Sequence, residues 1–71
     1  MVSKNNLFYK AAVQHFTAKK QEALAVLEMY FNNSTAVGDH SNILQEIIEH
    51  TKMLAEAEES LVVLDHYADD T

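Results

Sequence analysis

The sequence predicts an all-α protein, an antiparallel hairpin of two long helices that pairs with a second copy to form a four-helix bundle. Three observations predict this fold. The 71-residue chain contains no proline and one glycine, so it lacks the residues that most strongly interrupt helices. Apolar side chains recur every three or four residues in two long stretches. Turn-forming residues gather between these stretches, over 32–40. The whole chain, 1–71, is therefore expected to be a single domain.

The first helix is expected over about residues 5–31. Its large apolar residues follow one helical face with spacings of 4, 3, 8, 3 and 4. Lys20 fills the widest step, because its aliphatic stem can lie along apolar surface. Ser3, Asn5 or Asn6 is expected to cap the helix. The face consists of Tyr9, Val13, Phe16, Leu24, Leu27 and Phe31, and it is widened by Ala12, Ala23, Val26 and Tyr30.

The second helix is expected over about residues 41–67, with a stripe whose spacing alternates between 3 and 4. Gly38, Asp39 and His40 end the loop, and Ser41 or Asn42 is expected to start the helix. Asn42 with Gln45 has the form of a capping box. The chain is expected to fray after Tyr67, because the acidic C-terminus lies at the unfavourable end of the helix dipole. The stripe consists of Ile47, His50, Leu54, Ala57, Leu61, Leu64 and Ala68.

Association between copies is expected for a chain of this size. So small a fold buries barely enough apolar surface to offset the entropy of ordering it, and without cysteine it has no disulfides. Both apolar stripes are wide enough to contact more than one neighbouring helix. A symmetric dimer would cover the surplus. The predicted core is Phe16, Leu24, Leu27, Phe31, Ile47, Leu54, Leu61 and Leu64, and Tyr9, Val13, Tyr30 and His50 complete the core and dimer interface.

Charge and hydropathy narrow the class of function. The net charge is −6, with +2 in residues 1–31 and −8 in residues 32–71. An acidic chain without a basic stripe is a poor candidate for direct nucleic-acid binding. No apolar run has the length of a membrane span or of a signal peptide, so a cytoplasmic protein that does not contact membranes is expected. The short chain also disfavours an enzyme with a deep pocket, and no cofactor is expected.

Three groups of side chains are candidate sites. Glu46 and His50 lie one turn apart and could hold a metal ion if a dimer gathered further ligands. Glu22 is one such ligand: in the predicted antiparallel hairpin residue i of one helix lies opposite residue 72 − i of the other, which places Glu22 near His50. A hydrogen-bonded seam histidine is the favoured alternative.

Asp39, His40 and Ser41 have the residue types of a hydrolytic triad. Consecutive loop residues do not point their side chains at one another as a catalytic relay requires, and helix capping explains these residues.

The acidic residues of the second helix form a third group, with two interpretations. A solvated helix face that keeps the protein soluble is favoured. The alternative is a surface that imitates nucleic-acid phosphates and inhibits a basic protein. The group consists of Glu56, Glu58, Glu59, Asp65, Asp69 and Asp70.

Residues 22–33, followed by Val37-Gly38-Asp39-His40, resemble a pattern in small helical proteins of cyanobacterial tailed phages. In that pattern an apolar helix ends in Tyr and Asn residues before a Gly-acid-His turn. The resemblance implies an accessory phage protein that acts in the host cytoplasm by contacting a host or phage protein. The functional hypothesis is therefore a non-enzymatic interaction or regulatory module, with the metal-binding bundle and the acidic mimic as alternatives.

Overall fold

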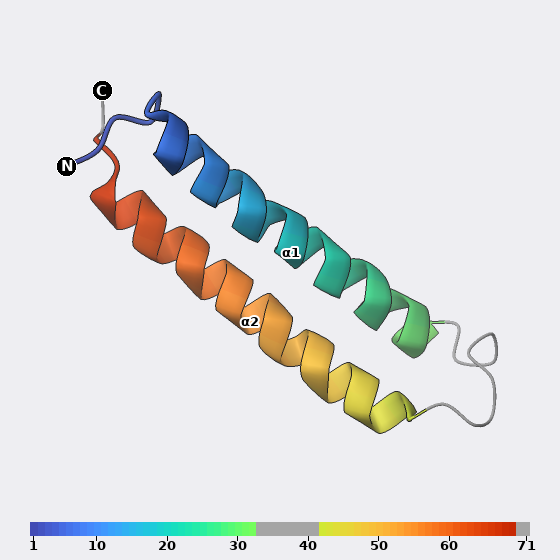
Figure 1. Cartoon of the computed structure of the whole chain (residues 1–71). Coiled ribbons are helices and arrows are strands. Elements are labelled where there is room, and N and C mark those ends of the chain that lie inside the picture. The colour runs from blue at the N-terminus through green and yellow to red at the C-terminus, as the bar shows by residue number, and fades with distance from the viewer. Residues whose placement is uncertain (33–41, 70–71) are drawn as a thin grey trace.

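The computed structural model describes residues 1–32 and 42–69, which form two long helices packed side by side. Helix α1 spans Leu7–Asn32 and helix α2 spans Ile43–Tyr67. The helices run in opposite directions, so the two termini lie at the same end of the molecule (Figure 1). The predicted helical hairpin is confirmed, with helix ends within two residues of those expected. Residues 33–40 of the expected loop, including Gly38, Asp39 and His40, lie outside the described residues, as does Ser41.

Asn6 caps helix α1. Its side-chain Oδ1 accepts a hydrogen bond from the backbone N–H of Tyr9 at 3.1 Å, which satisfies one of the free donors of the first helical turn. The Ser3 hydroxyl oxygen accepts from the backbone N–H of Asn5 at 3.1 Å, and the Ser3 carbonyl accepts from that of Asn6 at 3.0 Å. The turn over residues 3–6 places the helix start at Leu7 instead of Asn5 and confirms that one of the three predicted residues is the cap.

The predicted capping box at the start of α2 is wrong. Asn42 does occupy the N-cap position, but its side chain makes no capping hydrogen bond. The amide of Gln45 donates instead to Oε1 of Glu49, at 3.3 Å, along the exposed side of the helix. Only the Asn42 carbonyl takes part in the helix, accepting from the backbone N–H of Glu46 at 3.0 Å. Among the described residues, the first turn of α2 is therefore capped by a backbone hydrogen bond and not by the Asn42 side chain.

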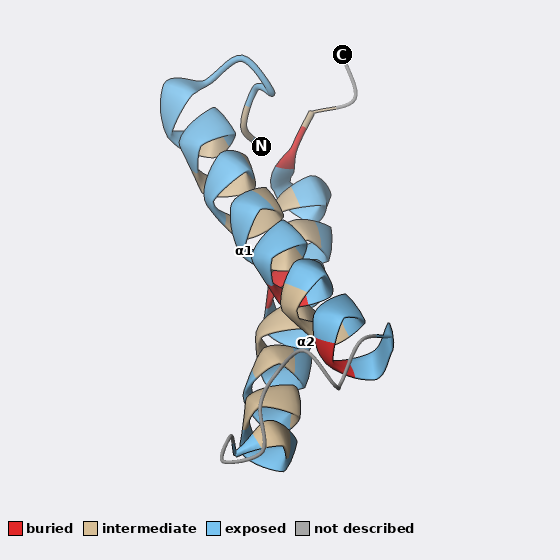
Figure 2. Ribbon diagram, turned by 90° about the vertical axis from the view of Figure 1, so that its right-hand side faces the viewer, coloured by how far each residue is buried: buried red, intermediate tan, exposed pale blue. Residues whose placement is uncertain are grey.

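The contact between the helices follows a heptad pattern on both of them. In α1 the inward positions are 9, 13, 16, 20, 23, 27 and 30, and in α2 they are 43, 47, 50, 54, 57, 61 and 64. Ala23, Tyr30 and Ala57 are buried, and the other inward residues are half-buried (Figure 2). The alternating step of 3 and 4 keeps these positions on one face of each helix. The seam thus combines small residues near its middle with larger ones toward its ends.

Two of the predicted core residues do not belong to this contact. Leu24 and Phe31 are exposed, and their neighbours Ala23 and Tyr30 take the inward positions. The reason is geometric: the step of eight residues from Phe16 to Leu24 turns the helix about 80° past the seam, whereas the step of seven to Ala23 stays within about 20° of it. Leu24 and Phe31 are therefore outer-surface residues of the hairpin.

The chain ends are joined by a short backbone pairing that the sequence analysis did not anticipate. Val2 and Ala68 form a parallel β-bridge. The Val2 N–H donates to the Tyr67 carbonyl and the Asp69 N–H donates to the Val2 carbonyl, each at 2.8 Å. Helix α2 ends at Tyr67 as expected. The fraying predicted beyond it does not occur at Ala68, which is buried, or at Asp69, which is hydrogen-bonded, while residues 70 and 71 lie outside the described residues.

The hairpin is long and thin, measuring 50 × 16 × 15 Å with a radius of gyration of 15.7 Å. A compact 71-residue domain would have a radius of gyration of about 11 Å. Among the described residues no large side chain is fully buried, while several large apolar ones are exposed on both helices. Two helices alone expose much of their apolar surface to water.

Candidate functional site

The most enclosed histidine among the described residues is His50, which lies in the seam. Its Nδ1 lies 2.8 Å from the backbone carbonyl oxygen of Glu46, one turn earlier in α2. A carbonyl oxygen only accepts, so the Nδ1–H of His50 is the donor of this hydrogen bond. The Glu46 carboxylate is farther away, with Oε1 at 3.9 Å from Nδ1. These contacts are those of a hydrogen-bonded seam histidine.

The residues considered as metal ligands do not converge within the hairpin. Among residues 1–32 and 42–69 no three histidine, aspartate or glutamate side chains are placed to hold a metal ion together. Glu22, expected near His50, instead lies 3.9 Å from the Nζ of Lys19 on its own helix. His15 packs against the neighbouring Phe16 ring, edge to face, with centroids 4.9 Å apart and an interplanar angle of 83°. The described geometry supplies no ligand set beyond the Glu46–His50 pair.

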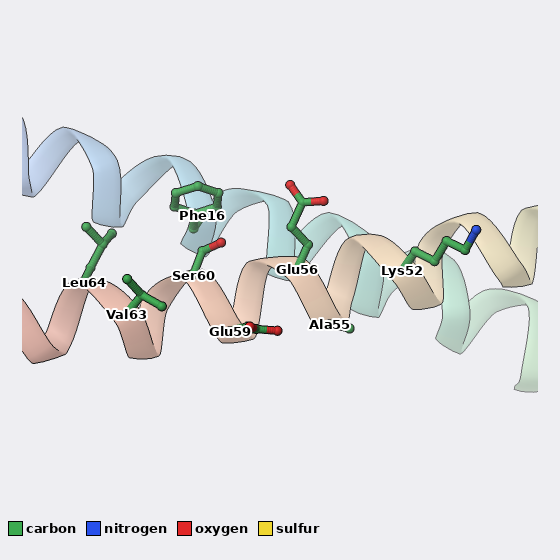
Figure 3. A pocket seen from close by; sticks show the side chains of 8 residues that line it. All are labelled: Phe16, Lys52, Ala55, Glu56, Glu59, Ser60, Val63 and Leu64. Carbon is green, nitrogen blue, oxygen red and sulfur yellow. The ribbon is translucent and has the colours of Figure 1, made fainter.

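A surface groove of about 620 Å³ lies along one side of α2. Figure 3 shows Phe16 reaching from α1 beside Ser60 of α2, with Glu56 and Lys52 farther along the same helix. The groove is open and mixes apolar walls with one positive and two negative side chains. Seven of its eight lining residues belong to α2: Lys52, Ala55, Glu56, Glu59, Ser60, Val63 and Leu64.

A second hollow of about 300 Å³ continues this groove toward the start of α2. Both hollows are lined by Phe16, Lys52 and Glu56. Phe16 and Ala57 also line the second hollow together, as the predicted register of the hairpin requires. The two hollows form one long depression, which we call the α2 groove. Its long, open shape suits the binding of an elongated segment such as a helix, and it differs from the enclosed pocket that binds a small molecule.

The opposite side of the hairpin carries an ion pair between the helices. Nζ of Lys20 lies 3.8 Å from Oε2 of Glu58, and both residues line a third hollow with Leu61, Val62 and Asp65. Lys20 thus fills an inward heptad position with its stem and pairs its ammonium group at the rim, as the sequence suggests. Both side chains are partly exposed, so the pair contributes little to stability.

The predicted site residues divide into two groups. The seam brings together residues that the sequence analysis placed there, namely Tyr9, Val13, Phe16, Leu27, Tyr30, Ile47, His50, Leu54, Leu61 and Leu64. Leu24 and Phe31 lie outside it. The α2 groove was missed, because most of its lining residues fall on the outer positions of the second heptad pattern, although Phe16 and Leu64 belong to the seam. The spacing of Lys52 and Glu59, seven residues apart on that outer face, was the available signal.

No protein-family model, curated protein or solved structure matches this chain. Among the described residues, neither helix combines the length and the apolar character needed to cross a bilayer. The geometry of the hairpin is therefore the evidence for the function of this protein.

Proposed function

We propose that this protein is a non-enzymatic interaction module, a helical hairpin that associates with a second copy as a four-helix assembly and acts by contacting another protein. One observation supports the proposal above the others: the hairpin leaves large apolar side chains in water on both helices, while its buried set consists of three alanines and one tyrosine. Scattered apolar residues on a surface need no explanation, but here the outer surface carries more large apolar side chains than the seam buries.

The energetics of the seam support self-association. Alanine removes little apolar area from water, so a contact centred on Ala23 and Ala57 contributes little burial free energy for its length. The elongated shape, with a radius of gyration of 15.7 Å, leaves both flanks of the helix pair open. A second hairpin laid on one flank would convert exposed apolar surface into a shared core without changing either helix. A contact to a host or phage protein would then use the surface that remains.

The proposal is tested by the mass of the protein in solution. Sedimentation equilibrium over about 1–200 µM is expected to show the mass rising from 8.0 kDa toward twice that value. Far-UV circular dichroism over the same range is expected to show helix content rising with the mass, because the hairpin gains stability when its apolar flank is covered. A fully helical particle of 8.0 kDa at every concentration would overturn the proposal.

A further inference from the structure

We propose that the α2 groove binds helix α2 of a second copy. The two α2 helices pack antiparallel about a two-fold axis that passes between Ala55 and Glu56. The inference rests on the proposed function, since it assigns the surface through which the copies associate. Both Ala55 and Glu56 line the groove, near the middle of its length. In such a pair, residue i of one copy lies opposite residue 111 − i of the other, because positions 55 and 56 face each other across the axis.

Four of the five exposed large apolar residues of α2 form symmetric pairs about this axis; the fifth, Val62, lies opposite Glu49. Leu44 lies opposite Tyr67 of the second copy, and Ile48 lies opposite Val63. All four side chains are exposed in the single hairpin. The axis therefore pairs apolar with apolar at two levels on each side, and by symmetry every contact occurs twice. Leu44 to Tyr67 extends over ~35 Å at ~1.5 Å per residue, which is nearly the full length of α2.

The charges of the groove obey the same symmetry. Lys52 is the single lysine or arginine of α2, and it lies opposite Glu59 of the second copy. Both residues line the groove and both are exposed. Two such pairs form per dimer. A slip of one helical turn in one direction places Val63 opposite Lys52 and removes the ion pair, and a slip in the other direction keeps a glutamate, Glu56, opposite Lys52 but places Ile48 opposite Ser60. Charge and apolar pairing together therefore select a second copy in one register, not an unspecified apolar partner.

The side chains beside the axis allow the two helices to approach. Ala55 presents only a methyl group at the crossing point. Glu56 opposes association, since the two-fold axis brings it near its own copy, but Lys52 lies one turn away on the same helix. The opposite flank of the hairpin offers no comparable match, because its lysine, Lys20, is already paired with Glu58 within the chain.

Charge reversal tests the register. Lys52→Glu and Glu59→Lys each place like charges opposite each other twice per dimer, and each is expected to weaken dimerisation about tenfold or more in sedimentation equilibrium. The double variant Lys52→Glu/Glu59→Lys restores both pairs in reversed order and is expected to return within about threefold of the original dissociation constant. Lys10→Glu and Glu28→Lys, which make the same charge changes at exposed positions of α1, are expected to have little effect.

A cysteine placed at the axis tests the contact independently of charge. The chain has no cysteine, so Ala55→Cys introduces one thiol per copy. Oxidation is expected to cross-link Ala55→Cys dimers on a non-reducing gel, whereas Ala25→Cys, an exposed alanine of α1, is expected to stay uncrosslinked. A dimer that the double variant fails to restore, or that cross-links equally at both positions, overturns this surface and leaves the proposed function standing. A strictly monomeric original protein overturns both.

Discussion

Two adjacent aromatic residues near the end of α1 are expected to respond very differently to truncation. Tyr30 is 8% exposed and Phe31 is 68% exposed, so 92% and 32% of their surfaces are withdrawn from water. For a side chain of roughly 200 Å², the difference is about 120 Å². At about 25 cal/mol per Å², Tyr30→Ala should therefore destabilise the protein by about 3 kcal/mol more than Phe31→Ala. A chain of this length has a total stability of about 4–10 kcal/mol, so the difference is a large fraction of the whole.

Urea unfolding followed by far-UV circular dichroism measures this difference. The two variants are compared with the original protein at one fixed protein concentration, because the proposed association would contribute to the stability of all three. Phe31→Ala should unfold near the original midpoint, and Tyr30→Ala should unfold at a much lower urea concentration or be unfolded without urea. Both variants truncate an aromatic side chain to a methyl group, and the two positions are adjacent, so each is the control for the other. Equal midpoints, or a larger effect at Phe31, would show that the seam runs through Phe31 and that the heptad assignment is wrong.

The remaining predictions concern the helix ends and the seam. Asn6→Ala should lower stability by about 1 kcal/mol by removing the cap of α1, whereas Asn42→Ala should change it little; equal losses in thermal melts would contradict the capping assignment. Val2→Pro removes the N–H that donates to Tyr67 and should cost about 1 kcal/mol, with faster amide exchange at Asp69; unchanged exchange would show that the terminal bridge does not persist. Leu54→Asp places an unpaired carboxylate in the seam and should abolish folding or assembly, and retained helicity with an unchanged mass would refute the seam assignment.

The two helices and their antiparallel pairing were predictable because they depend on local features of the chain. The absence of proline and the regular recurrence of apolar residues predicted α2 to its last residue, Tyr67. The error in α1 arose from ranking residues by size. Leu24 and Phe31 are larger than Ala23, but only the step of seven residues from Phe16 continues the seam. Following spacing before size would have placed Ala23 and Tyr30 inward from the sequence alone.

Other features depend on contacts that no local pattern encodes. The bridge between Val2 and Ala68 joins opposite ends of the chain, and it forms only because two helices of nearly equal length return the backbone to its starting point. The missing side-chain cap at Asn42 has a different, local cause: the residue type favours a cap, but the Asn42 backbone, with φ −84° and ψ 69°, lies outside the extended conformation typical of N-cap residues. The α2 groove required knowing which face of α2 the first helix leaves uncovered.

The distribution of residue sizes between the two faces of α2 connects the fold to its proposed association. The inward face carries Ala57 and the hydrogen-bonded His50 at its centre, so the helices can approach closely but bury little apolar area there. The outward face carries Ile48 and Val63, which are larger and exposed. The inward contacts thus determine the geometry of the hairpin. Burial of the outward face of α2 would contribute more free energy, but one copy cannot cover that face. Folding and association are consequently coupled, because any second chain that covers the outward face binds the folded hairpin and not the unfolded chain.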